Sequence, residues 1–334
     1  MKKVSIIVPL YKSEMFMVKL IDSILNQTYK NIELLLIDDE SPDQSGKIAD
    51  DYALRDNRVI SIHQKNQGCC GARNTGLERV TGEYLMFADG DDWMERDCVE
   101  YLVGLMEKYD CEMAMTDNIF TTRDQQQVKK DNIRIWSKEE ATCGILYTDI
   151  PVGPWNKIYT TEVVKRNKLS FSVAWFGEGL YFSVMAAQYS NKTAVGSRKI
   201  YNYRLNNPNS GTTVREIRNG INALKNIKYI KDNLIVRTKR TIDAANWHIW
   251  LNNFGLIAYI ISAKDINNNK MLFADAKKEM HELFPTVFRN SGLWNAKITF
   301  RKYPVILFAT IFPVTIAKLF IWNKNRRFKK DNFE

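Results

Sequence analysis

The sequence is poor in the residues that build disulfide frameworks and metal-thiolate sites. Its 334 residues include five cysteines and three histidines, and no two cysteines have the CxxC spacing of a zinc or redox site. An odd number of cysteines without such a framework is typical of a reducing compartment. We therefore exclude a disulfide-stabilised secreted scaffold and expect a cytoplasmic protein.

Two familiar phosphate-binding sequences are also absent. No GxGxxG follows the first strand-like segment, and no GxxxxGKS or GxxxxGKT loop occurs, which argues against a sheet that binds NAD or ATP in the usual ways. The amino terminus passes from Met1 into a strand-like segment without the apolar region of a signal peptide, which favours the same cytoplasmic expectation.

Charge is distributed unevenly along the chain. The net charge is +10, but residues 1–190 carry −7 and residues 191–334 carry +17. An acidic first part suits a metal site, and a basic second part suits an anionic surface such as the cytoplasmic leaflet of a membrane. A solvated basic face without a partner is the simpler alternative. We expect no nucleic-acid partner, because the basic tail adjoins an apolar helix and not a stripe of interleaved aromatic side chains.

The first third of the chain alternates between strand-like and helix-like segments. Residues 4–8, 32–37 and 59–62 are apolar and rich in β-branched or leucine side chains, as in strands covered on both faces. Residues 18–25 have helical periodicity, and Ser41 followed by Pro42 predicts the start of a second helix with Ser41 as its N-cap. This order is typical of a doubly wound α/β sheet, which binds ligands at the carboxyl ends of its strands.

The segment from Tyr84 to Trp93 is the strongest candidate for a functional site. A short apolar run ends in Asp89, Asp91 and Asp92. A buried strand would carry the first two to the edge of the sheet, where such a pair is stable mainly beside a cation. Mg²⁺ is often held by one or two carboxylates and the phosphates of a substrate. The alternative is an acidic turn that caps the following helix, which is our interpretation of Asp92.

A second candidate is the small-residue segment 66–77. Residues 66–68 predict a turn, and the small residues that follow allow the segment to approach the sheet closely, with Arg73 projecting from it. The planar guanidinium suits phosphate recognition, and a surface ion pair is the alternative.

Five motifs occur in an order that resembles a known family. They are Val4–Tyr11, Leu35–Asp43, Asn66–Gly68, Ala72–Gly76 and Phe87–Trp93. Together they closely resemble the inverting family 2 glycosyltransferases with the GT-A fold. The resemblance is dense over residues 4–94 and thinner to about residue 212. It implies an α/β GT-A domain with a doubly wound mixed sheet over residues 1–213, followed by a helical C-terminal region.

The resemblance also implies the ligands and the residues that bind them. The donor is a nucleotide-sugar, most often a UDP-sugar, and the cofactor is a divalent metal, Mn²⁺ or Mg²⁺. Glu40 stands where the family usually has glycine, a change expected to alter a turn without touching the chemistry. By matching position, the implied donor and metal residues are Pro9 and Tyr11 flanking the base, Asp39 hydrogen-bonded to it, Arg73 near the diphosphate, Asp89 near the ribose or metal, and Asp91 on the metal.

Two later segments are implied to face the acceptor. Trp155 and Asn156 belong to a segment that resembles one below the acceptor site in capsule and exopolysaccharide members. Trp155 could stack on a sugar or belong to the core. Glu178 and Gly179 fall where the family has a Glu-Asp pair whose aspartate is usually the general base.

Glycine cannot accept a proton, so Glu178 is the nearest candidate base. Three alternatives stay open: Glu178 caps the following helix, the base comes from elsewhere, or activity is reduced.

The rest of the chain is predicted to be helical, over residues 214–297 and again over an apolar helix with a basic tail at 298–334. The apolar run from Tyr303 to Trp322 contains Pro304, Pro313 and Lys318, which favours a helix lying in the membrane interface over a membrane span. A hydrophobic contact in a homo-oligomer is the alternative.

The sequence therefore predicts a hexosyl- or N-acetylhexosaminyltransferase, peripheral on the inner face of the cell membrane. The predicted acceptor is a glycan, often lipid-linked in this family, in bacterial surface polysaccharide synthesis. The alternative is a non-catalytic nucleotide-sugar-binding partner of an active homologue.

Overall fold

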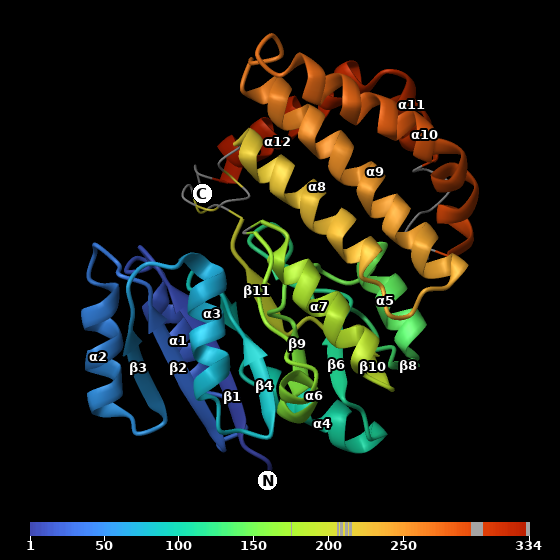
Figure 1. The fold of residues 1–334 in the computed structure, drawn as a ribbon. Helices are drawn as coiled ribbons and strands as arrows, with labels where there is room; N and C mark the ends of the chain where they lie inside the picture. The colour runs from blue at the N-terminus through green and yellow to red at the C-terminus, as the bar shows by residue number, and fades with distance from the viewer. Residues whose placement is uncertain are drawn as a thin grey trace. The chain divides into compact units, whose positions relative to one another are not determined.

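The computed structural model describes residues 1–174, 176–205, 207, 210, 213, 216–294 and 303–331. The chain divides into two compact units (Figure 1), one of Met1–Ala141 with Ile150–Arg204 and one of Thr142–Asp149 with Leu205–Glu334. Residues 298–302 and 332–334 of the predicted C-terminal segment lie outside the described residues.

The first unit is built on an eight-stranded mixed sheet in the order β3-β2-β1-β4-β9-β6-β10-β8. Strand β1 lies between β2 and β4 and is parallel to both, whereas β9 runs antiparallel to β4 and β6. The predicted mixed α/β sheet is therefore confirmed. The strands are β1 (Val4–Leu10), β2 (Ile32–Asp38), β3 (Val59–His63), β4 (Tyr84–Phe87), β6 (Met113–Thr116), β8 (Arg134–Trp136), β9 (Lys157–Thr160) and β10 (Thr193–Gly196).

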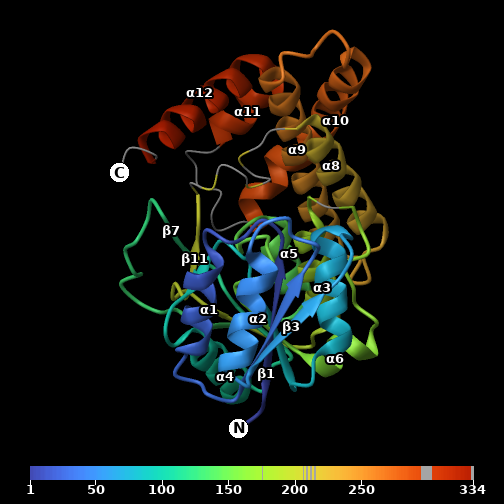
Figure 2. The ribbon, with the colours of Figure 1, turned by 90° about the vertical axis from the view of Figure 1, so that its left-hand side faces the viewer.

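Helices cover both faces of this sheet, and α1 and α3 flank it in Figure 2. Helices α1 and α4 share one apolar cluster with β1 and β2. On the other face a Cβ placed on Gly76 of α3 would lie 2.5 Å from Ile7 Cγ2, so only glycine lets this helix sit so close to β1. The helices are α1 (Met17–Leu25), α2 (Ser45–Arg55), α3 (Gly68–Arg79), α4 (Cys98–Tyr109), α5 (Lys138–Leu146), which continues into the second unit, α6 (Thr161–Arg166) and α7 (Glu178–Tyr189).

The start of α2 was predicted wrongly. The helix begins at Ser45 and not after Ser41, because the Asp43 carboxylate accepts hydrogen bonds from both the backbone N–H and the hydroxyl of Ser45. Ser41 instead donates its hydroxyl to the carbonyl of Leu10 (3.4 Å) at the end of β1. The segment between β2 and α2 is thereby hydrogen-bonded to the end of β1.

A small second sheet stands beside the end of β4. Its central strand is β11, which pairs antiparallel with β5 and parallel with β7. Residues 201 and 202 of β11 face Met94 and Trp93 directly, so the chain leading out of the first unit is joined to the acidic segment that ends at Asp92. These strands are β5 (Trp93–Met94), β7 (Phe120–Thr121) and β11 (Tyr201–Tyr203).

The second unit is helical, and α9 is the helix that α8, α10 and α12 all contact. Among the described residues no single helix combines the length and apolar composition needed to cross a membrane. The pair Pro304–Ile311 and Pro313–Arg327, bent by 118°, meets those two criteria only when taken together. The helices are α8 (Ile217–Asp232), α9 (Lys239–Ser262), α10 (Lys270–Trp294), α11 (Tyr303–Ile311) and α12 (Pro313–Asp331).

Acidification is expected to destabilise the second unit through His248, which is buried on α9. Its Nδ1 donates to the carbonyl of Leu146 (2.7 Å), and burial lowers its pKa to about 4. The unfolded chain takes up a proton near pH 6.5, so the unfolded state binds more protons between about pH 6.5 and about pH 4, and stability falls as the pH falls through that window. We expect a loss of about 2–3 kcal/mol between about pH 8 and about pH 4.5.

Urea unfolding at both pH values measures this loss, with the fluorescence of the neighbouring Trp247 and Trp250 as the signal. The control is His248→Gln, whose amide can still donate to Leu146 but does not titrate. If the glutamine variant loses as much stability as the wild type, another group is responsible.

Candidate active site

Three parallel strands bring the predicted donor residues to one edge of the sheet. Tyr11, Asp39 and Asp89 follow the carboxyl ends of β1, β2 and β4, which are neighbours and run in the same direction. The backbone N–H of Asp39 donates to the carbonyl of Leu10 (2.9 Å), so these two strand ends are tied together. Pro9 is half-buried at the end of β1, and the ring of Tyr11 is exposed beyond it.

Asp39 is buried and held in one orientation. One carboxylate oxygen accepts from the side-chain amide of Gln64 (2.7 Å) and from the backbone N–H of Gln67 (2.8 Å). The next residue, Glu40, has φ = 57°, a left-handed conformation that glycine adopts without strain. Its carboxylate accepts from the backbone N–H of Asn66 (3.1 Å), a contact that glycine could not make.

Arg73 on α3 joins two carboxylates that are far apart in the sequence. Its Nη2 donates to Asp89 (2.7 Å) and its Nη1 donates to Glu178 (2.9 Å), while the guanidinium lies over the ring of Phe171. The side chain is almost fully buried. Burial alone would lower the pKa of Arg73, but the charges of Asp89 and Glu178 outweigh burial and raise it well above its usual range.

Glu178 is the first residue of α7, and both of its carboxylate oxygens accept hydrogen bonds. One oxygen accepts from Arg73 and the other from the backbone N–H of Phe176 (2.9 Å). The carboxylate therefore fixes the turn before α7 and orients the arginine. The role of Glu178 as a base stays a prediction.

Gly179 packs directly against the loop before β9. A Cβ at this position would lie 2.8 Å from Cδ of Pro154, closer than real Cβ atoms approach. A side chain at this position would therefore collide with the proline ring at its first carbon atom. The glycine at position 179 is therefore required by the packing of α7 against Pro154.

We expect Gly179→Ala to destabilise the first unit by about 1–2 kcal/mol, because overpacking at Pro154 outweighs the helix preference of alanine. Urea unfolding measures the effect. In a Pro154→Ala background the Cδ atom is gone, so the same change should become neutral or stabilising. Equal stability of Gly179→Ala and the wild type would contradict the packing argument.

The carboxylates after β4 lie in three different environments. Asp89 is partly exposed, and its backbone N–H donates to the hydroxyl of Tyr201 (3.1 Å). Asp91 is half-buried, and its carbonyl accepts from Nε of Arg204 (2.6 Å). Asp92 is fully buried, and its carboxylate accepts from the backbone N–H of Arg204 (2.8 Å).

The interpretation of Asp92 as a helix cap is wrong. Strand β5 follows it directly, and its carboxylate binds a residue at the end of β11. Burial, together with the charges of Asp91 and Asp89, raises the pKa of Asp92 well above its ordinary range. Negative charge is thus crowded in this segment.

Tyr201 and Arg204 are site residues that sequence reasoning did not single out. The Arg204 guanidinium lies over the rings of Phe16 (4.3 Å) and Trp93 (5.1 Å), and burial lowers its pKa. Both residues occur in the run Ile200–Arg204, within the stretch to about residue 212 where the family resemblance is thin. That run was the available signal, but it did not show that the strand would pair with the acidic segment.

The acidic segment fits a divalent cation in the chemistry of its donors. Asp89 and Asp91 supply carboxylate oxygens, the ligands that Mg²⁺ and Mn²⁺ prefer, and a cation would relieve the repulsion among the neighbouring carboxylates. Within the described ranges no group of three His, Cys, Asp or Glu side chains is arranged to hold a metal. Substrate phosphates and water would have to complete the coordination.

Trp155 and Asn156 are both buried. The Trp155 ring stacks on Tyr201 and Tyr203, at 4.8 and 5.4 Å between ring centroids. The Asn156 amide donates to the carbonyl of Thr116 (2.6 Å) and accepts from the buried ammonium of Lys157 (2.7 Å). Core packing accounts for these contacts, and the predicted acceptor role of both residues stays a prediction.

In a comparison with known protein families, one family model matches more than half of the chain. The model of the family described as Glycosyl transferase family 2 matches residues 5–181. Glycosyltransferase GlyA of Streptococcus pneumoniae is 31% identical over 216 residues, which are 61% of this chain and 30% of GlyA. The uncharacterized glycosyltransferase EpsJ of Bacillus subtilis is 34% identical over 218 residues, or 63% of each chain. The chain therefore spans less than two thirds of the length of either relative.

Solved structures of low sequence identity share the fold. TarS 1–349 of S. aureus, in complex with UDP-GlcNAc, is similar with a TM-score of 0.65 and 18% identity, over 96% of this chain and 92% of that one. The mannosyltransferase PcManGT of Pyrobaculum calidifontis, in complex with GDP-Man and Mn²⁺, has a TM-score of 0.56 and 14% identity, over 93% and 87%. The predicted GT-A fold is therefore confirmed.

Proposed function

This chain belongs to glycosyl transferase family 2, and from that membership we propose that it transfers a sugar from a nucleotide-sugar to a hydroxyl group of a glycan. The observation that carries the proposal is the convergence of Asp39, Arg73 and Asp89 at the carboxyl edge of β1, β2 and β4. This is the edge at which open α/β sheets bind their ligands.

The proposed donor is a UDP-sugar, with its base beside Tyr11 and Asp39. Tyr11 offers an exposed aromatic face, and the fixed carboxylate of Asp39 can accept hydrogen bonds from a base. The diphosphate then lies toward Asp89 and Arg73. TarS with UDP-GlcNAc and PcManGT with GDP-Man support a nucleotide-sugar in a fold of this kind.

We propose that Asp91 and Asp89 hold Mn²⁺ or Mg²⁺. The metal, when bound, supplies positive charge that stabilises the leaving nucleoside diphosphate. The Arg73 guanidinium keeps the Asp89 carboxylate in a fixed place by its hydrogen bond. Arg204 holds the backbone of Asp91 through its Nε.

Inversion requires the acceptor hydroxyl to attack the anomeric carbon from the side opposite the diphosphate. The bond from that carbon to the diphosphate oxygen breaks with its electron pair, a bond to the acceptor oxygen forms, and the hydroxyl proton passes to a base. Glu178 is the proposed base. The hydrogen bonds from Arg73 and Phe176 each use one lone pair of a different carboxylate oxygen, and a remaining lone pair would accept the proton.

The proposed acceptor is a lipid-linked glycan of a bacterial surface polysaccharide, and the transferred group is a hexosyl or N-acetylhexosaminyl unit. Trp155 and Asn156 would support the acceptor side from beneath, because both are buried. A lipid-linked acceptor places the enzyme on the inner face of the cell membrane, and the charge of +17 over residues 191–334 supports that location.

A second candidate is a non-catalytic partner that binds nucleotide-sugar beside an active homologue. Gly179 favours it, since the family's usual base is missing and a Cβ at this position would collide with Pro154.

Release of nucleoside diphosphate from a panel of UDP- and GDP-sugars with Mn²⁺ tests the proposal. We expect release above the rate of a sample with EDTA for at least one donor. Donor binding without release, in the presence of lipid-linked acceptors, would favour the non-catalytic partner.

A further inference from the structure

The outer side of α11 is made of hydrocarbon. Val305, Phe308 and Ile311 recur at helical spacing on one face and are each about half exposed, as is Phe312 at the break that follows. The buried side of the same helix is formed by Ile306, Ala309 and Thr310. A helix that faces water carries polar or charged side chains on its outer side.

The polar group of this helix points inward. The Thr310 hydroxyl accepts from the indole N–H of Trp250 on α9 (3.1 Å) and donates to the carbonyl of Ile306 (2.9 Å). Both hydrogen-bonding functions of that side chain are thus used inside the second unit. The packing of the second unit thus holds the one polar side chain of this set inside and leaves the apolar ones outside.

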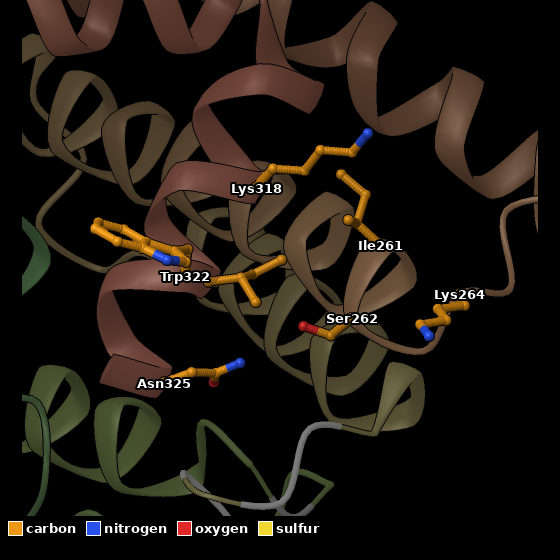
Figure 3. Close-up of a pocket in the computed structure, with 7 residues that line it drawn as sticks. Ile261, Ser262, Lys264, Lys318, Trp322 and Asn325 are labelled. Carbon is orange, nitrogen blue, oxygen red and sulfur yellow. The ribbon is translucent and has the colours of Figure 1, made fainter. Parts of the chain in front are cut away.

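Helix α12 adds cations and an aromatic ring next to this apolar face. Trp322 is 59% exposed, and the Arg326 guanidinium lies 5.1 Å from its ring centroid. Figure 3 shows Trp322 and Asn325 of α12 opposite Ile261 and Ser262 of α9, around a groove of about 410 Å³ that Lys264 and Lys318 also line. Tryptophan and basic side chains together are typical of the boundary between lipid headgroups and acyl chains.

Charge decides between the two occupants that could cover this face. Residues 303–327 contain Lys318, Lys324, Arg326 and Arg327 and no aspartate or glutamate. A second copy of the chain, related by a twofold axis, would bring like charges together. An anionic lipid surface would neutralise them and would also accept the hydrocarbon.

We propose that the face formed by Val305, Phe308, Ile311 and Phe312 enters the headgroup–acyl boundary of an anionic bilayer. The cations of α12 then lie at the level of the lipid phosphates. The bend of 118° between the two helices suits a pair that lies in the interface. The inference rests on the proposed membrane location and not on sugar transfer, since vesicle binding is measured without a donor.

Co-sedimentation of the full chain with vesicles of phosphatidylglycerol and phosphatidylcholine in equal amounts tests the inference. The face variant is Phe308→Ser with Phe312→Ser, and the charge variant replaces Lys318, Arg326 and Arg327 with glutamine. Leu54→Ser on α2, at a side chain that is 86% exposed in the first unit, is the control. Circular dichroism melts establish that each variant is folded.

The face variant is expected to lose about tenfold or more in vesicle partitioning, and Leu54→Ser should lose nothing. The charge variant should bind the mixed vesicles only as weakly as the wild type binds pure phosphatidylcholine.

The inference would be overturned if the face variant partitioned onto the vesicles as strongly as the wild type. It would also be overturned if the wild type did not bind the vesicles. A third contradicting result is a wild type that is dimeric and does not bind vesicles, together with a face variant that is monomeric. A second copy of the chain would then cover the face. None of these results bears on sugar transfer, and a failure of transfer leaves vesicle binding intact.

Discussion

Replacing Asp91 with alanine is expected to lower nucleoside diphosphate release by about a thousandfold, or about 4 kcal/mol in the activation free energy. The loss follows from the proposed role of this carboxylate in holding the metal that stabilises the leaving diphosphate. The hydrogen bond from Nε of Arg204 is made to the backbone carbonyl of Asp91, so alanine retains it. Initial rates with saturating Mn²⁺ measure the effect.

The matched control is Glu107→Ala on α4. This carboxylate is exposed and interacts electrostatically with Lys2, at the amino ends of the strands, so it lies away from the edge that carries Asp91. Its loss should leave the rate unchanged. An Asp91→Ala enzyme that keeps more than about a tenth of the wild-type rate would remove Asp91 from the metal site.

Replacing Arg73 is expected to affect both stability and catalysis. Arg73→Met leaves Asp89 and Glu178 without their shared cation, and because the arginine is almost fully buried we expect a loss of about 3–5 kcal/mol in the free energy of unfolding. Arg73→Lys keeps the charge, but a single ammonium cannot reproduce the fork that binds both carboxylates. We expect it to reduce kcat/KM by about a hundredfold, since Asp89 is no longer held in place.

Urea unfolding and initial rates measure the two effects. In the double variant Arg73→Met with Glu178→Gln, one of the two unpaired charges is removed, so part of the lost stability should return. If Arg73→Met is as stable as the wild type, the two ion pairs do not form in solution.

Glu178→Gln separates the two roles open to Glu178. Glutamine has one carbonyl oxygen, so it can accept from Arg73 or from Phe176 but not from both, and it cannot take up a proton. If Glu178 is the base, kcat falls by a factor of about a hundred or more and the acidic limb of the pH–rate profile disappears. If it only positions Arg73, most of kcat remains and the donor KM rises modestly.

The strands and the edge of the sheet could be predicted from the sequence because local pattern decides them. Apolar segments such as Val4–Val8 and Ile32–Ile37 can only be buried between two layers, and polar residues at their carboxyl ends then lie together. The segment around Gly76 was predicted to approach the sheet, and a Cβ on Gly76 would indeed lie only 2.5 Å from Ile7 Cγ2.

The contacts that define the site could not be predicted in the same way. Arg73 and Glu178 are 105 residues apart, and the hydrogen bond between Asp92 and Arg204 spans 112 residues. No local propensity reports such a pairing. The role assigned to Asp92 failed for this reason, because a capping pattern was read where a long-range contact is formed. The place of Gly179 against Pro154 likewise depends on how the start of α7 meets the loop before β9.

The most direct test of sugar transfer is to follow a radiolabelled sugar from its nucleotide into organic-solvent-extractable, lipid-linked acceptor. The donor would be the one that gives the highest diphosphate release, and binding of that donor would be measured by calorimetry in the same preparation. The account predicts that label enters the lipid fraction with Mn²⁺ and the wild type, but not with EDTA or with Asp91→Ala. Tight Mn²⁺-dependent binding of the donor with no label in the lipid fraction would contradict it.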